Sequence, residues 1–263
     1  DIYVPGAAAP DVAIAPPGAA GSAPALWEAP AAILYDNGPL VTHPGGGFGG
    51  ADASAVQTAL LQSTFGFGHA LTSGFRMADD FTVPAGGWNV TQITFFAYQT
   101  GSTTTSTINH INLRIWDGPP GVGSVVFGDT TTNLFAGSSF TNDYRVTDTA
   151  LTGNTRPIMA DVATVVTFLP AGTYWVDWQT GGTLASGPWA PPVSILGLTA
   201  KPGANGQQFN PTTPPGSWAP AVDAGSGAVQ DLPFIIEGTP AGGPAITMAK
   251  TGGLVATVCG IDE

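Results

Sequence analysis

Cysteine is almost absent from this sequence, since Cys259 is the only one in 263 residues. A single cysteine cannot form an internal disulfide framework, so packing, bound ions or contacts with other chains must stabilise the fold. Long apolar runs are missing as well. No stretch approaches the roughly 18 apolar residues of a membrane-spanning helix, so we expect no membrane insertion.

Charge is also scarce, and positive charge is the scarcer sign. Only 9% of the residues are charged, and six Lys and Arg against 18 Asp and Glu give a formal net charge of -12. Such a chain repels phosphate backbones, which excludes nucleic acid as a partner. The rarity of lysine and the Thr, Ser and Gly content are typical of bacterial secreted proteins. With Asp1 read as a processed N-terminus, they predict an extracellular or cell-surface location in a bacterium.

Glycine and proline are abundant, at 37 and 24 residues, and they separate short alternating segments from about residue 75 to 238. In the segment "INLRIW", Ile111, Leu113 and Ile115 share one face, while Asn112 and Arg114 lie on the other. Many short strands with frequent turns predict an all-β fold. We expect a two-sheet antiparallel sandwich, jelly-roll-like, over residues 33–240.

One segment favours a helix instead. In "ASAVQTALLQS", residues 53–63, Ser54 and Gln57 have the spacing of a capping box, and Val56 and Leu60 form an apolar stripe. The pattern predicts one short helix lying over a sheet edge.

Both ends of the chain have the composition of extended arms. Residues 1–32 are rich in Ala, Pro and Gly, which favours extended backbone over helix. Residues 241–263 resemble two short strands joined by a Gly-Gly turn. Because burial of one large apolar side chain contributes about 1.5 to 3 kcal/mol, apolar residues in both arms are candidate subunit contacts. They are Ile2, Val4, Val12, Ile14, Ile246, Met248, Leu254, Val255 and Val258.

Several motifs together resemble a domain of bacterial secreted proteins that often carry surface-sorting segments. They are "DDFTVPAGGWNVTQITFFAY", "INLRIWDGPPGVGS", "PAGTYWVDWQTGG" and "QDLPFIIEG", within residues 75–238. This resemblance implies an extracellular β-sandwich and carries no catalytic residue with it. The ending "ITMAKTGGLVATVC" is similar to the start of an immunoglobulin-like repeat of bacterial surface proteins. That second resemblance implies a cysteine that pairs further along the chain, and whether Cys259 pairs with another chain stays open.

No catalytic constellation stands out. His43, His69 and His110 lie in unlike contexts, and "GGGFGG" at residues 45–50 fits a dinucleotide loop only by its glycine content. We therefore predict no enzymatic activity and no cofactor. Aspartates recur at expected strand ends, namely Asp36, Asp117, Asp129, Asp143, Asp148 and Asp223. Turn chemistry alone explains that pattern, but one structural calcium with unknown ligands is the alternative.

Tryptophan is frequent, with seven residues, and Trp178, Trp189 and Trp218 lie in or near Gly- and Pro-rich stretches. Exposed indole rings in such loops could stack on sugar rings; the competing interpretation is a core packed with tryptophan. Two functions follow as hypotheses. The first is a structural subunit of a surface assembly or filament, joined to copies of itself by strand addition through the arms. The second is a polysaccharide-binding module of a longer secreted protein.

Overall fold

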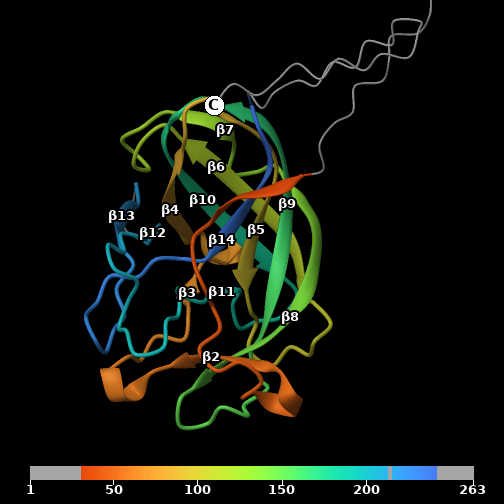
Figure 1. Cartoon of the computed structure of the whole chain (residues 1–263), viewed down its shortest axis with the longest axis vertical. Coiled ribbons are helices and arrows are strands. Elements are labelled where there is room, and N and C mark those ends of the chain that lie inside the picture. The colour runs from red at the N-terminus through yellow and green to blue at the C-terminus, as the bar shows by residue number, and fades with distance from the viewer. Residues whose placement is uncertain (1–30, 213–214, 242–263) are drawn as a thin grey trace, which may run out of the picture.

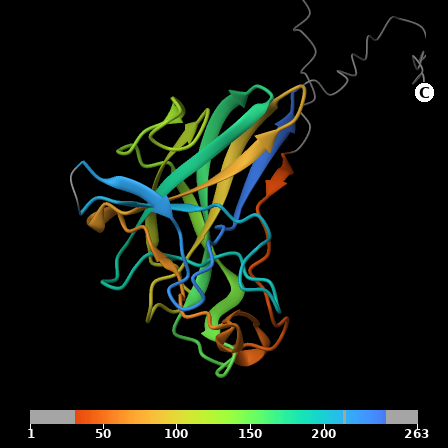
Figure 2. The same ribbon diagram turned by 90° about the vertical axis from the view of Figure 1, so that its left-hand side faces the viewer.

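The structure, a computed structural model, describes residues 31–212 and 215–241. Strands dominate this part of the chain, and two six-stranded sheets stack into a sandwich (Figures 1 and 2). The predicted all-β sandwich is therefore confirmed. No helix in the described ranges is long and apolar enough to cross a membrane.

The first sheet has the order β1-β14-β5-β9-β8-β2 and the second has the order β13-β12-β4-β10-β6-β7. Pairing is antiparallel throughout both sheets except between β2 and β8, which run parallel. The strands of the first sheet are β1 (Ala32–Asp36), β2 (Asp52–Val56), β5 (Trp88–Ala97), β8 (Phe135–Thr147), β9 (Pro157–Leu169) and β14 (Phe234–Pro240). Those of the second are β4 (Arg76–Val83), β6 (Ile108–Trp116), β7 (Val125–Gly128), β10 (Gly172–Gly182), β12 (Gln207–Asn210) and β13 (Ser217–Pro220). A two-stranded sheet joins β3 (Phe67–Gly68) to β11 (Trp189–Ala190), and three 3-10 turns are η1 (Phe48–Gly50), η2 (Thr58–Leu60) and η3 (Leu71–Ser73).

The core lies between the sheets and follows the alternation seen in the sequence. Ile111, Leu113 and Ile115 of β6 are fully buried in it, and Val176 and Trp178 of β10 join them from the neighbouring strand. Because side chains alternate along a strand, every second side chain lies on the same face. Because strands from both sheets contribute such a face, the apolar side chains interdigitate in one continuous core.

The predicted helix at residues 53–63 is wrong. Residues 52–56 form β2, whose Ala53 packs with Tyr144 in a small satellite core, and only the short turn η2 follows. The capping box does not form, because the Ser54 hydroxyl contacts Arg145 and Ser194 instead. Pairing with the end of the long strand β8 outweighs the local helix signal, as tertiary context often does.

The chain enters and leaves the sandwich at one place. Ala32 at the start of β1 is the register partner of Gly238 near the end of β14. Strand β2 and the turn η1 lie at the far end of the molecule (Figure 1). The two points at which the described part of the chain begins and ends are therefore close together. The predicted contacts Ile2, Val4, Val12, Ile14, Ile246, Met248, Leu254, Val255 and Val258 all lie outside the described residues.

Candidate functional site

A buried polar cluster lies on the face of the second sheet that points away from the main core. Its centre is Asp177 of β10, which is fully buried although its neighbours Val176 and Trp178 fill the opposite face. Asp177 pairs with Arg76 of β4, and its second oxygen accepts a hydrogen bond from Arg114 Nε at 2.9 Å. The Trp116 indole N–H also donates to that oxygen. Two cations and an indole thus converge on one carboxylate.

Amide side chains complete this cluster around Arg76. Its Nη1 donates to Asn112 Oδ1 at 2.6 Å and to Gln179 Oε1 at 2.8 Å, whereas Nη2 is buried and has no hydrogen-bond partner in the described part of the chain. Burial lowers the pKa of Arg76, and the charge of Asp177 opposes that shift. Nearly every group here is paired with another, so we interpret the cluster as a scaffold holding β4, β10 and β6 together.

The three tryptophans proposed for glycan stacking occupy unlike places. Trp178 is 1% exposed and stacks on Phe95 at 4.6 Å between ring centroids, so it is a core residue. The prediction that Trp178 binds a glycan is therefore wrong, because no sugar can reach a ring enclosed between two sheets. The alternation within "TYWVDW" places Trp178 on the same face as Tyr174 and Val176, which already indicated that Trp178 is buried.

Trp189 and Trp218 are half-buried and are not brought together. Trp189 lies on β11, and its indole N–H donates to Ser186 Oγ at 3.3 Å. Trp218 of β13 packs against Trp116 and Trp175 on the outer face of the second sheet. The structure thus gives no joint stacking platform from these two rings, although part of each remains exposed.

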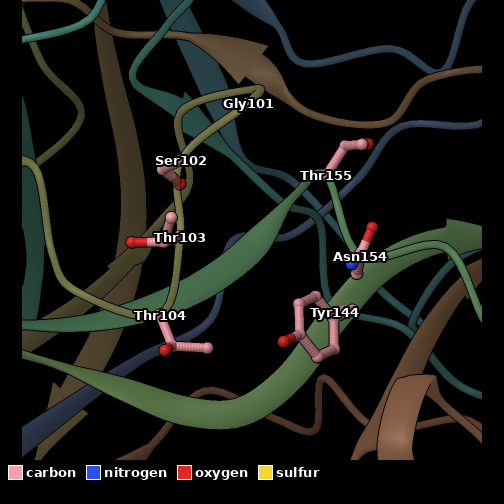
Figure 3. A pocket seen from close by; sticks show the side chains of 7 residues that line it. All are labelled: Gly101, Ser102, Thr103, Thr104, Tyr144, Asn154 and Thr155. Atoms are coloured by element: carbon pink, nitrogen blue, oxygen red, sulfur yellow. The ribbon is translucent and has the colours of Figure 1, made fainter.

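A shallow hollow of about 350 Å³ opens at the end of the sandwich where β5 stops. Sequence reasoning did not identify it, because its residues come from separate segments. Figure 3 shows the loop of residues 101–104 on one side, facing Asn154, Thr155 and the Tyr144 ring. The lining consists of Gly101, Ser102, Thr103, Thr104, Tyr144, Asn154 and Thr155. None of these side chains is charged, and all except glycine offer a hydroxyl or an amide group.

Several polar groups of this hollow are available to a ligand. Within the described ranges, the side chains of Thr104, Tyr144 and Asn154 make no hydrogen bond. In Figure 3 the Tyr144 hydroxyl points toward the side of the loop that carries Thr104. The site therefore presents unpaired hydroxyl and amide groups, whereas the Tyr144 ring itself is only 6% exposed and packs in the satellite core with Ala53 and Phe140.

The histidines form no common site. His69 is buried next to Thr180, and burial lowers its pKa to about 4, so the ring is neutral. His43 shares a hydrogen bond with Thr42, and His110 lies on β6 with a pKa lowered by partial burial. In residues 31–212 and 215–241, no group of three or more His, Cys, Asp or Glu side chains is arranged to hold a metal.

Hydrogen bonds from backbone N–H groups account for five of the six aspartates named from the sequence. Asp223 accepts backbone hydrogen bonds from Thr64 and Ser226, and Asp148 accepts one from Thr58. Asp36, Asp117 and Asp129 likewise accept from backbone N–H groups in their own loops. For Asp36 and Asp129 this is the local chemistry of a tight turn, whereas Asp148 reaches across the fold to the turn η2.

Asp143 is the exception. It lies on β8 directly beside Asp52 of β2, both of its carboxylate oxygens are buried, and neither has a hydrogen-bond partner in the described part of the chain. Burial, and secondly the charge of Asp52, raises the pKa of Asp143 to about 7, and the charge of Arg145 opposes that rise. The residue before it, Asn142, has a left-handed backbone with φ of 62°. A buried acid whose oxygens make no hydrogen bond within the described ranges therefore sits where the pairing of β8 with β9 is irregular, between Phe140 and Tyr144.

No protein-family model, no curated protein and no solved structure matches this chain. The two resemblances to bacterial surface proteins therefore stay predictions. Function has to be inferred from the geometry described above.

Proposed function

We propose that this domain binds a neutral polysaccharide, with one sugar unit seated in the hollow between residues 101–104 and Tyr144. The observation that carries the proposal is the chemistry of the lining, in which uncharged hydroxyl and amide groups converge on one hollow. Sugars present many hydroxyl groups, and a lining of uncharged hydrogen-bond donors and acceptors complements them. The volume of about 350 Å³ lies at the lower end of the range for small-ligand sites, which fits one ring of a longer chain.

Charge favours a neutral sugar over an acidic one. The formal net charge of -12 repels anionic polysaccharides, and no lining residue carries a compensating cation. The cations Arg76 and Arg114 are committed to Asp177 in the scaffold cluster on the other sheet. An extracellular bacterial setting, in which such polysaccharides are exposed, is part of the same proposal.

The first prediction tests this site. A glycan array identifies a neutral ligand, and Asn154→Ala then weakens its binding about tenfold, because one direct hydrogen bond contributes about 1 to 1.5 kcal/mol. Isothermal titration measures the dissociation constants. Asn89→Ala is the matched control, since Asn89 is also exposed but lies at the other end of β5, about 30 Å away. Binding only of acidic glycans, or equal losses in both variants, would contradict the proposal.

Self-assembly by strand addition is a second candidate function, and the position of β1 favours it. Strand β1 is an edge strand, and within the described residues its outer edge has no partner strand. An open edge can accept a strand from another copy. The segments predicted to supply such a strand attach beside this edge, at Ala32 and Gly238. Contacts of this head-to-tail kind can extend into filaments.

The second prediction concerns this edge. We expect the full chain to form oligomers or filaments, and Ile33→Lys to shift it to monomers, because a lysine on an edge strand opposes pairing with another strand. Ile33 is 62% exposed, so the change leaves the fold intact. Val166→Lys is the control, since Val166 is 78% exposed but lies on the inner strand β9. Size-exclusion chromatography with light scattering and electron microscopy provide the readout. A monomeric wild type speaks against assembly.

A further inference from the structure

The strands β2 and β8 bring two carboxylates together at the far end of the sandwich. Asp52 and Asp143 are register partners on parallel strands, so their side chains lie on the same face. Asp143 is 2% exposed, and both of its oxygens lack a donor within the part of the chain that the structure describes. A buried ionised carboxylate without donors and with an acidic neighbour is strongly unfavourable, so it must either take up a proton or have a positive charge beside it.

The nearest cation, Arg145, supplies only part of that compensating charge, because it acts on Asp143 without a direct ion pair in the described ranges. Arg145 is on the same face of β8, two residues further along, yet its guanidinium donates to other acceptors. Its Nε and Nη2 donate to the Phe65 and Thr64 carbonyl oxygens, and Nη1 donates to the hydroxyls of Ser54 and Ser194. No ion pair joins Arg145 to Asp143 in the described residues. Arg145 therefore ties loops together, and its charge offsets that of the two carboxylates only in part.

Asp52 is held in place by the glycine-rich loop. One of its oxygens accepts a hydrogen bond from the Gly45 N–H at 2.7 Å. Gly47 approaches so closely that a Cβ atom there would lie 2.4 Å from the Asp52 carbonyl oxygen. The loop of residues 45–50 is thus folded tightly against the start of β2. Its glycines serve close backbone packing, which is a different use from the dinucleotide loop considered from the sequence.

We propose that Asp143 and Asp52 bind one calcium ion that fastens β2 and the glycine-rich loop to β8. Calcium accepts carboxylate, carbonyl and water oxygens in flexible arrangements of six to eight ligands, so two carboxylates can be combined with neutral oxygens. Magnesium fits less well, because it demands near-ideal octahedral geometry and retains several waters. The site is separate from the hollow, because Asp143 and Tyr144 are consecutive residues of one strand and point to opposite faces.

The third prediction tests this ion with the full chain after treatment with a chelator. Adding calcium in about 100-fold excess over its dissociation constant raises the melting temperature of the wild type by about 5 °C or more. Isothermal titration gives one bound calcium, and magnesium binds at least tenfold more weakly. Asp143→Asn abolishes the calcium-dependent shift, and Asp52→Asn reduces calcium affinity at least tenfold.

Asp161→Asn is the control, because Asp161 is likewise a buried carboxyl with one unpaired oxygen but has no acidic register partner. That variant keeps the full calcium response. An unchanged melting temperature of the wild type in calcium overturns the proposal, and so does a calcium response retained in both Asp143→Asn and Asp52→Asn. The readout needs no sugar ligand, so it is independent of the glycan proposal.

Discussion

Asp177→Ala is expected to lower the free energy of unfolding by about 3 to 5 kcal/mol, the usual loss when one partner of a buried ion pair is removed. The variant leaves Arg76 buried without its counter-charge and removes the acceptor of Arg114 Nε and of the Trp116 indole. Urea denaturation followed by tryptophan fluorescence measures the change. An unfolding midpoint close to that of the wild type would show that the cluster contributes little.

Two further variants separate the charge from the cavity. Asp177→Asn keeps the volume and removes the charge, so a loss similar to that of Asp177→Ala identifies the uncompensated Arg76 as the cause. Asp80→Ala is the matched control on β4. Asp80 is partly exposed, and its side chain makes no hydrogen bond with the described part of the chain. We expect that variant to change stability by no more than about 0.5 kcal/mol.

The alternating segments allowed the sandwich to be predicted because one buried face per strand leaves a period of two in the sequence. Ile111, Leu113 and Ile115 show this pattern and are buried as expected. The opposite face of the same strands was harder to interpret. Asn112 and Asp177 have the polarity of a solvated surface, yet both are fully buried. Their burial depends on partners such as Arg76, which is more than 30 residues from either of them.

Local propensity was misleading where the chain is stabilised by distant pairing. The segment 53–63 has good helix-forming residues, but β2 gains backbone partners from β8, which begins about 80 residues later. The same long-range pairing places Asp52 beside Asp143. The hollow also draws its lining from around residues 101–104, 144 and 154–155. Both candidate sites are thus assembled from segments whose proximity no short motif encodes, whereas the aspartates in turns follow from local chemistry.

Asp161 is expected to make the fold less stable as the pH rises from about 4 to 7. It lies on β9 on the same side as the core residues Ala163 and Val165, where burial raises its pKa to about 7. Ser138 donates to one oxygen at 2.6 Å, and the other is unpaired within the described residues. The carboxyl ionises near pH 4 in the unfolded chain but only near pH 7 in the folded one. The folded state therefore binds more protons between these values, and raising the pH favours unfolding.

Asp161→Asn removes this pH dependence, because the amide is neutral at every pH and can still accept the hydrogen bond from Ser138. A shift of about three pKa units corresponds to roughly 4 kcal/mol, so the variant should exceed the wild type by about 2 to 4 kcal/mol at pH 7.5 and match it near pH 4. Urea denaturation in chelator-containing buffers at four pH values measures the free energy of unfolding of the wild type and of the variant. The difference between the two values at each pH is the contribution of the Asp161 carboxyl. Asp36→Asn, the same substitution at an exposed turn, is the control for the chemical change itself. A curve for Asp161→Asn that runs parallel to that of the wild type would mean that the Asp161 carboxyl is already ionised in the folded protein, with solvent or a bound cation reaching it.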